Sequence, residues 1–564
     1  MSKKIGSVNR AKSRHFSRLR GLSLGLPAAL VAAPAAHAFQ LYDGTQHGNN
    51  WEVNLNITAS YTGMLRVGAV NQTLASGIIN TNGNDGDANL RHGIVNNTFE
   101  VLPVLDIKNG TFGMHFSGEY FVNTVYLHGN QNNQPAWTIN PIVASTNSYA
   151  SQTRTANGNS GRLLDAFVYD SWNFAHGQQI TLKAGQQTLF WGQSLFSTDG
   201  ISGGQAPIDS VQAQNLVNPQ SQQVFLPVGQ IVATYQPDQT YTIQGYYQYQ
   251  WEPTALQGVG SYFSTTDILG PGGYRLIAAN VGGNTYYLTR TKDLTPPSQN
   301  GQFGLSVQAQ YGNYDVGLFG LRYDAKNPEV YNFANPASLH AITGGYAVGT
   351  YQAVYPRDIW LYGTSLSTTV GATNLAGEVS VRTHAPLVGS TSAGSQTAAN
   401  MGNASNNPLY PVGNVMVGLM NAIYGSPALK FDPGGITLLG EVQWVNVFRV
   451  TDNKQYLQPG RTSNAATITA EVEPAYFEVL PNLELQFPVS LNYNIAGNSE
   501  YDTTMNHGTG YYSMSVLATY RENWTAQLSY NGYFGRVGTN PSYPQISALA
   551  TDRAYISLNL SHTF

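Results

Sequence analysis

The chain of 564 residues contains no cysteine and few charged side chains. Asp, Glu, Lys and Arg make up 10% of it, whereas an ordinary soluble domain carries about 25%. The lack of cysteine excludes a disulfide framework. The chain also lacks any run of about 20 apolar residues, which a membrane-spanning helix would need. This composition fits strands that are oily on one face and polar but uncharged on the other.

The last twelve residues, 553–564, show this pattern most clearly. Side chains of a strand alternate between its faces, so every second residue shares a side. One face carries Ala554, Ile556, Leu558, Leu560, His562 and Phe564, and the other carries Arg553, Tyr555, Ser557, Asn559, Ser561 and Thr563. A strand of an outer-membrane barrel has this length and places an aromatic ring at the interface. We therefore predict that Leu558, Leu560 and Phe564 close a barrel.

Residues 51–67 repeat the alternation, and between the two ends short and long connections alternate. Short turns are predicted near residues 109–110, 175–178, 237–239, 312–313, 371–373, 480–482 and 521–523, with a longer one at 425–435. Long connections fall near 68–96, 128–161, 193–222, 253–300, 326–357, 385–412, 449–466, 495–510 and 536–551. The rhythm predicts an all-β, antiparallel transmembrane barrel of about 18 strands, with 16 as the alternative. Short turns would be periplasmic and long loops extracellular.

The first 38 residues have the features of a signal peptide. Seven Lys and Arg residues precede a short apolar stretch at 22–33, and Ala36-His37-Ala38 resembles a cleavage site. We predict residues 1–38 as the cleaved signal peptide and 39–564 as one barrel domain in the outer membrane of a Gram-negative bacterium. Its partners there would be membrane lipids and the barrel-assembly machinery. The remaining 20 basic and 31 acidic residues give a net charge of about −11, which argues against nucleic acid as a partner.

Six stretches carry a resemblance to a known family. They are residues 164–168 (LDAFV), 185–192 (GQQTLFWG), 247–252 (YQYQWE), 261–267 (SYFSTTD), 355–359 (YPRDI) through 377–380 (GEVS), and 552–558 (DRAYISL). In these stretches the chain resembles the proteobacterial outer-membrane family called domain of unknown function 1302. The resemblance extends along nearly the whole mature sequence.

The resemblance implies a barrel linked to systems that handle hydrophobic compounds, such as steroids and hydrocarbons, or to resistance-type exporters. It implies no catalytic residues. The chain departs from its relatives at residues 206–214. Relatives tend to show Asn-Pro-x-Asp followed by a charged loop, but here Ala206-Pro207-Ile208-Asp209 leads into glutamines without a basic residue.

Two local patterns admit alternative interpretations. The Asn/Asp-rich residues 82–89 could offer oxygen ligands to calcium, but their spacing differs from the twelve-residue calcium loop, so we interpret them as a loop making its own turns. The second pattern is a set of aromatic residues that could form a ligand path or an aromatic girdle: Tyr241, Tyr247, Trp251, Trp172, Trp360 and Trp524. We favour the girdle, because Trp191 and Trp251 fall near the outer ends of predicted strands. We predict no metal and no cofactor.

The face opposite the oily one should line the lumen. The predicted pore-wall residues are Arg66, Glu100, His115, Glu119, Glu378, Arg382, Glu441, Gln443, Glu471, Glu473 and Glu484. Acids outnumber bases among them, so we expect a preference for cations or neutral solutes over anions. Residues 194–223 form a candidate constriction loop, whose only charges are Asp199 and Asp209 and whose path is interrupted at Pro207.

The favoured function is a channel for small uncharged or hydrophobic molecules. Sixteen to 18 strands enclose a lumen wide enough for solutes unless loops fold inward. One alternative is a non-conducting outer-membrane partner of an exporter, or a surface anchor. A lipid-modifying enzyme is a weaker alternative, because the sequence has neither a G-x-S-x-G nor an H-E-x-x-H motif. The sequence does not identify the solute.

Overall fold

The computed structural model describes residues 39–133, 147–298, 300–390, 392–428, 434–538 and 549–564. The predicted signal peptide, residues 1–38, lies outside the described residues.

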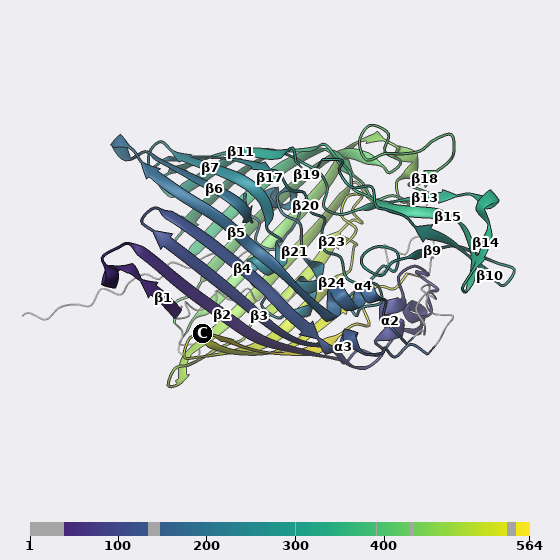
Figure 1. The fold of residues 1–564 in the computed structure, drawn as a ribbon, viewed down its shortest axis with the longest axis horizontal. Coiled ribbons are helices and arrows are strands. Elements are labelled where there is room, and N and C mark those ends of the chain that lie inside the picture. Colours follow the sequence, from purple (N-terminus) through teal and green to yellow (C-terminus); the bar gives the residue numbers. More distant parts are fainter. Residues whose placement is uncertain (1–38, 134–146, 299, 391, 429–433, 539–548) are drawn as a thin grey trace, which may run out of the picture.

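Eighteen antiparallel strands in the described part of the chain form a closed barrel, as predicted (Figure 1). They are β2 (Trp51–Arg66), β3 (Gly93–Asn109), β4 (Phe112–Asn123), β5 (Asn159–Asn173), β6 (Gln179–Gln187), β7 (Val228–Gln236), β8 (Tyr241–Gln248), β11 (Gln302–Tyr311), β12 (Tyr314–Tyr323), β16 (Ile359–Val370), β17 (Thr373–Pro386), β19 (Val412–Gly425), β20 (Ile436–Asp452), β21 (Asn464–Leu480), β22 (Leu483–Gln486) continued by β23 (Val489–Ala496), β24 (Gly510–Tyr520), β25 (Trp524–Phe534) and β26 (Tyr555–Thr563). Phe487 and Pro488 separate β22 from β23, which we count as one strand.

The barrel closes by pairing its last strand with its first. In this ladder Leu558 lies opposite Gly63 and Leu560 opposite Tyr61, and the Phe564 N–H donates to the Ile57 carbonyl at 3.0 Å. β1 (Phe39–Asp43) continues along β2 where β26 stops, with Phe39 opposite Leu55. Closure leaves no open edge, which would be costly in lipid.

Connections alternate between short and long, as the sequence predicts. Tight turns join β3 to β4, β11 to β12 and β16 to β17, with Gly110, Gly312 and Gly371 at positive φ. In Figure 1 the short turns lie at the left end of the barrel with β1, and the long loops lie at the right end.

The outward face is apolar. Leu558 and Leu560 are 41% and 45% exposed, while Ser557 and Asn559 between them are buried. The same alternation places Val442 and Trp444 outside and Glu441 and Gln443 inside on β20. Such an outer surface suits contact with lipid.

The long loops contain strands and short helices of their own. Three of them supply a second sheet at the long-loop end, formed by β9 (Arg275–Val281), β10 (Asn284–Arg290), β13 (Glu329–Ala334), β14 (His340–Ile342), β15 (Gly345–Val354) and β18 (Ser395–Gln396). Short helical segments are η1 (Gly44–His47), α1 (Gln72–Ala75), α2 (Asp85–Asn89), α3 (Thr124–Leu127), α4 (Ser151–Thr153), the π-helix η3 (Arg154–Gly158), η4 (Ala175–Gly177), η5 (Ile201–Gly204), α5 (Ser210–Asn215), α6 (Ser221–Val224), η6 (Pro336–Ser338) and η7 (Lys454–Tyr456). In the described ranges, every helix falls short of the length and hydropathy that a membrane crossing requires.

The Asn/Asp-rich residues 82–89 are buried rather than solvated. Asp87 on α2 forms ion pairs with Arg553 at 2.8 Å and Arg66 at 3.5 Å, and Arg66 also pairs with Asp552 at 2.9 Å. The Asn84 and Asp85 N–H groups donate to the Asp267 carboxylate. The ion pairs join the β2–β3 loop to the β25–β26 loop beside the β2–β26 seam, and the Asp267 contacts join the β2–β3 loop to the β8–β9 loop.

Candidate functional site

The long connection between β6 and β7 lies against the inner face of the barrel. Residues 188–227 join β6 to β7, and we call them the inner loop. They contain η5, α5 and α6 and include the predicted constriction residues Asp199, Pro207 and Asp209. Their side chains and backbone reach wall strands on opposite parts of the barrel, including β3, β4, β12, β17 and β20.

The first arm of the inner loop, residues 193–201, is held by two wall carboxylates. Glu441 on β20 accepts hydrogen bonds from the N–H groups of Leu195, Phe196 and Ser197 at 2.6, 3.1 and 2.7 Å. Glu378 on β17 accepts from the Ile201 N–H at 2.7 Å, and also from the Gln193 N–H at 2.5 Å. Hydrogen bonds from backbone N–H groups to carboxylates are charge-assisted and therefore strong. Both acids serve as anchors for the loop.

Arg382 and Gln443 complete this anchor. Arg382 donates to the Gly200 carbonyl at 2.8 Å and to the Asp199 carbonyl, and Gln443 donates to the Asp199 carboxylate at 2.8 Å. Burial and, to a lesser extent, the nearby Asp502 raise the pKa of Asp199 to about 7 against the opposing effect of Arg382. The loop therefore carries less negative charge near neutral pH than its sequence suggests.

The second arm of the inner loop, residues 209–223, is held by an ion pair that bridges the wall and the loop. Arg162 on β5 lies 3.2 Å from Glu119 on β4 and 2.5 Å from Asp209 in the loop. Gln223 of the loop donates to Glu100 on β3, and to Glu119 at 3.3 Å. Burial raises the pKa of Asp209, while the adjacent Arg162 opposes this shift. The Asp209 side chain also caps α5.

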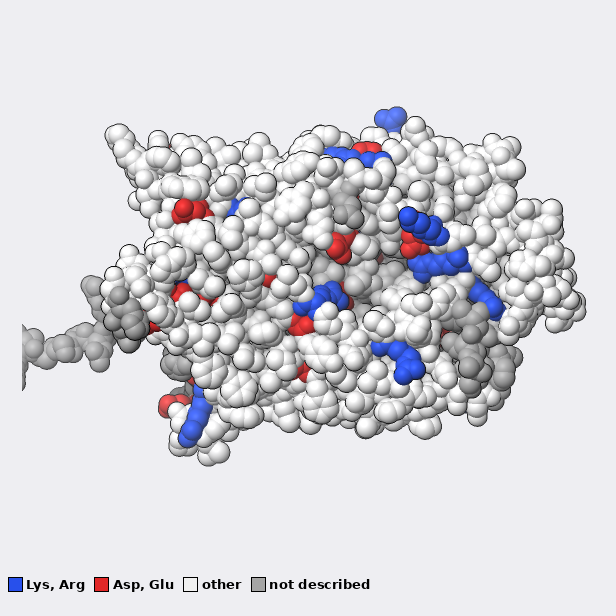
Figure 2. All heavy atoms as spheres, viewed as in Figure 1, with Lys and Arg blue, Asp and Glu red and all other residues white. Residues whose placement is uncertain are grey.

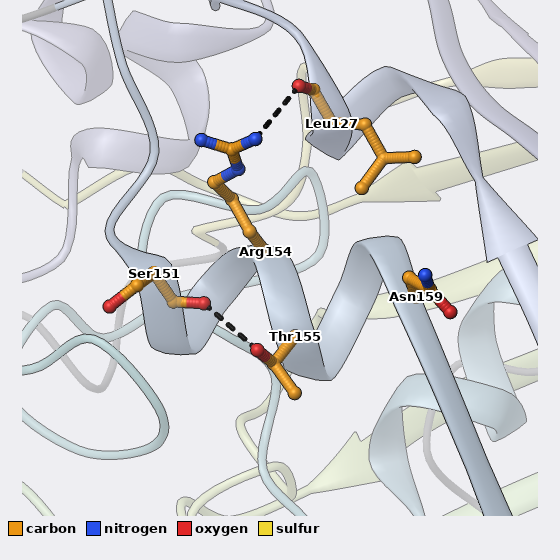
Figure 3. A pocket seen from close by; sticks show the side chains of 5 residues that line it. All are labelled: Leu127, Ser151, Arg154, Thr155 and Asn159. Carbon is orange, nitrogen blue, oxygen red and sulfur yellow. Dashed lines mark hydrogen bonds between the residues drawn. The ribbon is translucent and has the colours of Figure 1, made fainter.

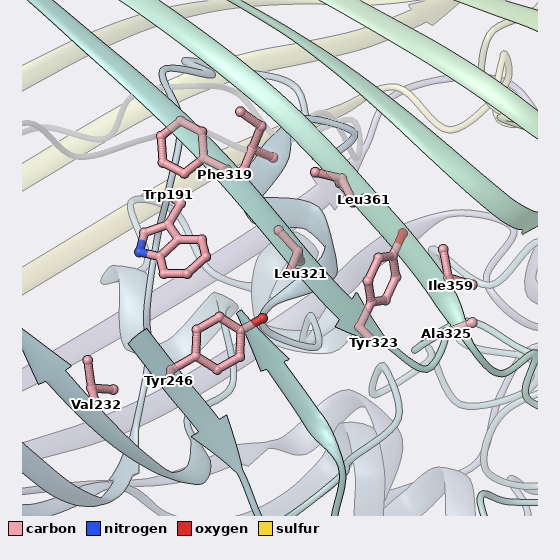
Figure 4. Packing of buried hydrophobic residues seen from close by; sticks show 10 residues of the cluster. Trp191, Val232, Tyr246, Phe319, Leu321, Tyr323, Ala325, Ile359 and Leu361 are labelled. Atoms are coloured by element: carbon pink, nitrogen blue, oxygen red, sulfur yellow. The ribbon is translucent and has the colours of Figure 1, made fainter. Parts of the chain in front are cut away.

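The inner loop also packs on an apolar part of the wall through Trp191 and Ile201. Trp191 lies 5.1 Å from the ring of Tyr246 and 5.8 Å from that of Phe319, and Ile201 belongs to the same buried cluster (Figure 4). Trp191 is 1% exposed and its indole N–H donates to Gln244 at 2.7 Å.

The girdle interpretation of Trp191 and Trp251 is wrong. Both are buried, with Trp251 packed against Tyr355 at 4.9 Å. Trp191 packs on apolar residues of β12 and β16, and Trp251 packs on loop residues that include Tyr355. A single sequence does not distinguish such apolar surfaces from a lipid interface.

A cavity of about 230 Å³ remains between the wall and the inner loop. It is lined by His115, Asp165, Phe167, Lys183, Gln187, Thr188, Phe190, Ser221 and Gln222. His115 pairs with Asp106 at 2.9 Å and stacks on Phe167 at 5.2 Å. The Lys183 ammonium group lies 5.3 Å from the centre of the same ring. Rings, amides and hydroxyls thus surround a small volume together with the charged side chains of Asp165 and Lys183.

A second cavity, of about 320 Å³, lies at the long-loop end. It is lined by Leu127, Ser151, Arg154, Thr155 and Asn159 (Figure 3). Arg154 donates to the Leu127 carbonyl at 3.3 Å, and Thr155 donates to the Ser151 carbonyl at 3.1 Å. The Arg154 guanidinium and the Thr155 hydroxyl thus bind backbone carbonyls of the same lining.

The structure separates the predicted pore-wall residues into groups. Glu378, Arg382, Glu441 and Gln443 meet at the first arm, and Glu100 and Glu119 meet at the second. Glu471 and Glu473 lie together on β21. Arg66 lies in the ion-pair network above the seam, and His115 lines the smaller cavity. Glu484 is half-buried on β22.

Sequence reasoning missed Arg162 and Lys183. Arg162 falls at a predicted loop boundary, although β5 begins at Asn159 and the alternation of that strand could have placed it inside. Lys183 follows the outward Leu182, so the same alternation marks it as inward. Among the described residues, no group of three or more His, Asp or Glu side chains has the geometry of a metal site.

The outer surface of the barrel carries few charges. Figure 2 shows a face that is mostly uncharged, with Lys and Arg gathered toward the long-loop end. A closed 18-stranded barrel with an apolar exterior and a loop against its inner wall is a porin-like β-barrel of the outer-membrane type.

The chain belongs to the family described as "Protein of unknown function (DUF1302)", whose sequence profile matches residues 19–564. A comparison with curated proteins found no match.

Three solved structures of barrels are similar to the chain. OccD3 (OpdP) of Pseudomonas aeruginosa is 11% identical, with 94% of this chain and 93% of that chain covered and a TM-score of 0.41. A BenF-like porin from Pseudomonas fluorescens Pf-5 is 10% identical, with coverage of 91% and 98% and a TM-score of 0.40. OccAB4 of Acinetobacter baumannii is 9% identical, with coverage of 91% and 98% and a TM-score of 0.42. The fold described above rests on the strand pairing itself.

Proposed function

We propose that the protein is a channel of the outer membrane of a Gram-negative bacterium that passes small uncharged or hydrophobic solutes. The observation that carries this proposal is the inner loop, which reaches opposite parts of the barrel wall. A loop held in this way narrows a lumen that 18 strands would otherwise leave wide.

The chemistry of the loop favours neutral solutes. Of its two charged residues, Asp209 is buried beside Arg162 and Asp199 is half-buried near Arg382. Four wall acids are engaged by the loop or by Arg162, so their carboxylates are not free to attract ions. The 230 Å³ cavity beside the loop presents amide groups, hydroxyls and aromatic rings, and its charged side chains are limited to Asp165, Lys183 and the neighbouring His115.

Removal of the inner loop tests the proposal. A variant in which residues 194–223 are replaced by a short Gly-Ser linker should conduct severalfold more current per open channel than the native protein in a planar bilayer. As a control, a similar shortening of residues 395–407, which contribute β18 to the second sheet at the long-loop end, should leave conductance close to the native value.

The same recordings separate the channel from its alternatives. A silent native barrel would favour an exporter partner or a surface anchor. An unchanged conductance in the loop variant would mean that the inner loop does not set the pore width. Uptake of neutral and charged probes of equal size into liposomes then measures the solute preference.

A further inference from the structure

The cavity of about 230 Å³ beside the inner loop has an aromatic side and a polar side. Phe167 on β5 and Phe190 in the inner loop supply the aromatic side, so one ring comes from the wall and one from the loop. His115 stacks on Phe167 with 5.2 Å between ring centres, and Phe225 packs edge-on with Phe190 at 4.6 Å. Both rings are therefore held in place by neighbouring side chains.

Asp165 on β5 belongs to the polar side. It faces inward because a β-bulge opposite Ser117 breaks the alternation of β5, so that the consecutive residues Leu164 and Asp165 are both buried. The Asp165 carboxylate accepts a hydrogen bond from the Ser117 hydroxyl at 3.1 Å. The bulge thus places a negative charge beside the aromatic rings.

Lys183 on β6 brings the opposite charge to the same cavity. Its ammonium group lies 5.3 Å from the ring centre of Phe167 and 6.0 Å from that of Tyr169. It interacts electrostatically with Asp165, but among the described residues it takes part in no hydrogen bond or ion pair. An ammonium group has three donors, and a carboxylate only accepts. The cavity therefore offers a solute both donors and an acceptor, with balanced charge.

The volume limits the solute to about one ring. Benzene fits an engineered apolar cavity of about 150 Å³, and pockets for drug-sized ligands begin at about 300 Å³. The present cavity, at about 230 Å³, lies between these values. It has room for a benzene ring with small substituents, but not for the fused rings of a steroid.

We propose that this cavity binds neutral phenols, which are single aromatic rings that carry a hydroxyl group. The ring lies against Phe167 and Phe190, while the hydroxyl accepts a hydrogen bond from Lys183 and donates one to Asp165. A hydroxyl group can do both. A carboxylate only accepts, and it would meet the negative charge of Asp165. The inference rests on the proposed channel function in so far as phenols are solutes that this channel passes.

Fluorine NMR of para-fluorophenol tests the cavity directly. The full-length barrel, folded in a neutral detergent, should broaden the fluorine resonance saturably and beyond the effect of detergent alone, and unlabelled phenol should reverse the broadening. Cyclohexanol, which lacks the aromatic ring, and benzoate, which lacks a donor at neutral pH, should compete more weakly than phenol. Native protein without phenol-reversible broadening would overturn the site, and benzoate competing as well as phenol would overturn the choice of solute.

The variant Lys183→Met keeps the length of the side chain and removes its donors. It should weaken binding of para-fluorophenol by at least about tenfold, because a hydrogen bond to a charged group is lost. Lys454→Met, at an exposed lysine in the loop between β20 and β21, is the matched control and should bind like the native protein. Native affinity in Lys183→Met would overturn the proposal.

Heat-modifiable migration on a gel verifies that each variant folds. If Lys183→Met did not fold, Phe190→Leu decides instead, because it leaves both charged groups in place and should weaken binding about threefold through loss of the ring contact. Conductance is recorded separately in a planar bilayer. A conducting barrel that does not bind phenol would overturn this inference alone, whereas a silent barrel that binds phenol through Lys183 would support the site and overturn the channel.

Discussion

Single side chains decide how the inside of this barrel is organised. Glu441 and Arg162 both point inward, yet one holds backbone N–H groups and the other bridges two carboxylates. Strand alternation indicates that such residues face inward, because the period of two is a property of the backbone. It does not identify their partners, which come from a loop more than a hundred residues away from Glu441.

The first prediction concerns the lipid-facing residue Leu558. Replacing it with Asp places a charge at the outer face near the middle of β26, at a cost of about 2 kcal/mol. The variant should fold and insert poorly, measured as loss of the heat-modifiable band. Leu480→Asp is the matched control, because Leu480 ends β21 at a short turn, where a charge can reach water. Full insertion of Leu558→Asp would contradict the assignment of faces.

A second residue-scale prediction concerns Asp267 in the loop between β8 and β9. Burial raises its pKa from 3.8 to about 7, although the Asp85 and Asn84 N–H groups favour the charged form. The folded protein therefore holds this proton more tightly than the unfolded chain. The resulting stabilisation is complete below about pH 4 and is lost as the pH rises to about 7.

Asp267→Asn keeps the shape and removes the titration. The temperature at which the native barrel converts to the slow-migrating form should fall between pH 5 and pH 8, and it should fall by less in the variant. Asp238→Asn, in an exposed short turn, serves as the control. An equal pH dependence in native protein and in Asp267→Asn would contradict the prediction.

At the scale of elements, the strands and turns could be predicted from the sequence, but the loops could not. Each hairpin is encoded locally, by alternation on both sides of a short turn such as Asn109-Gly110. The second sheet instead pairs segments of three different loops, for example Tyr286 with Tyr346 and Asn332 with Ser395. Such long-range pairs leave no periodic signal. The inner loop was a candidate from its length and composition alone, whereas its anchors depend on contacts across the barrel.

The third prediction concerns the anchoring of the inner loop. Glu441→Gln removes the charge from three hydrogen bonds, and bonds to charged groups contribute about 1.5–3 kcal/mol each. Amide hydrogen exchange of residues 195–197 should therefore speed up by at least about tenfold, measured by mass spectrometry in detergent. Glu484→Gln should leave this segment unchanged. Exchange at the native rate in Glu441→Gln would mean that the loop is held by its apolar contacts.

At the scale of the whole molecule, the distribution of charge sets the expected selectivity. Four of the predicted pore-wall acids bind the inner loop or Arg162, namely Glu100, Glu119, Glu378 and Glu441. Two others, Glu473 and Glu484, are inward and half-buried. We expect a small preference for potassium over chloride in the reversal potential under a salt gradient. Glu473→Gln/Glu484→Gln should reduce it. Anion selectivity of the native channel would contradict the expected lumen charge.

The pairing of β2 with β26 also fixes an order of events in time. β2 emerges early during synthesis, but its partner lies about 500 residues further along the chain, and contacts between such distant segments form late. The inner loop is synthesised long before β26. Its wall partners on β3, β4, β12, β17 and β20 also precede β26 in the chain, so the loop can reach them before the seam forms. We therefore expect the inner loop to be in place before β26 pairs with β2, and we expect this pairing to be the final and slowest step of assembly.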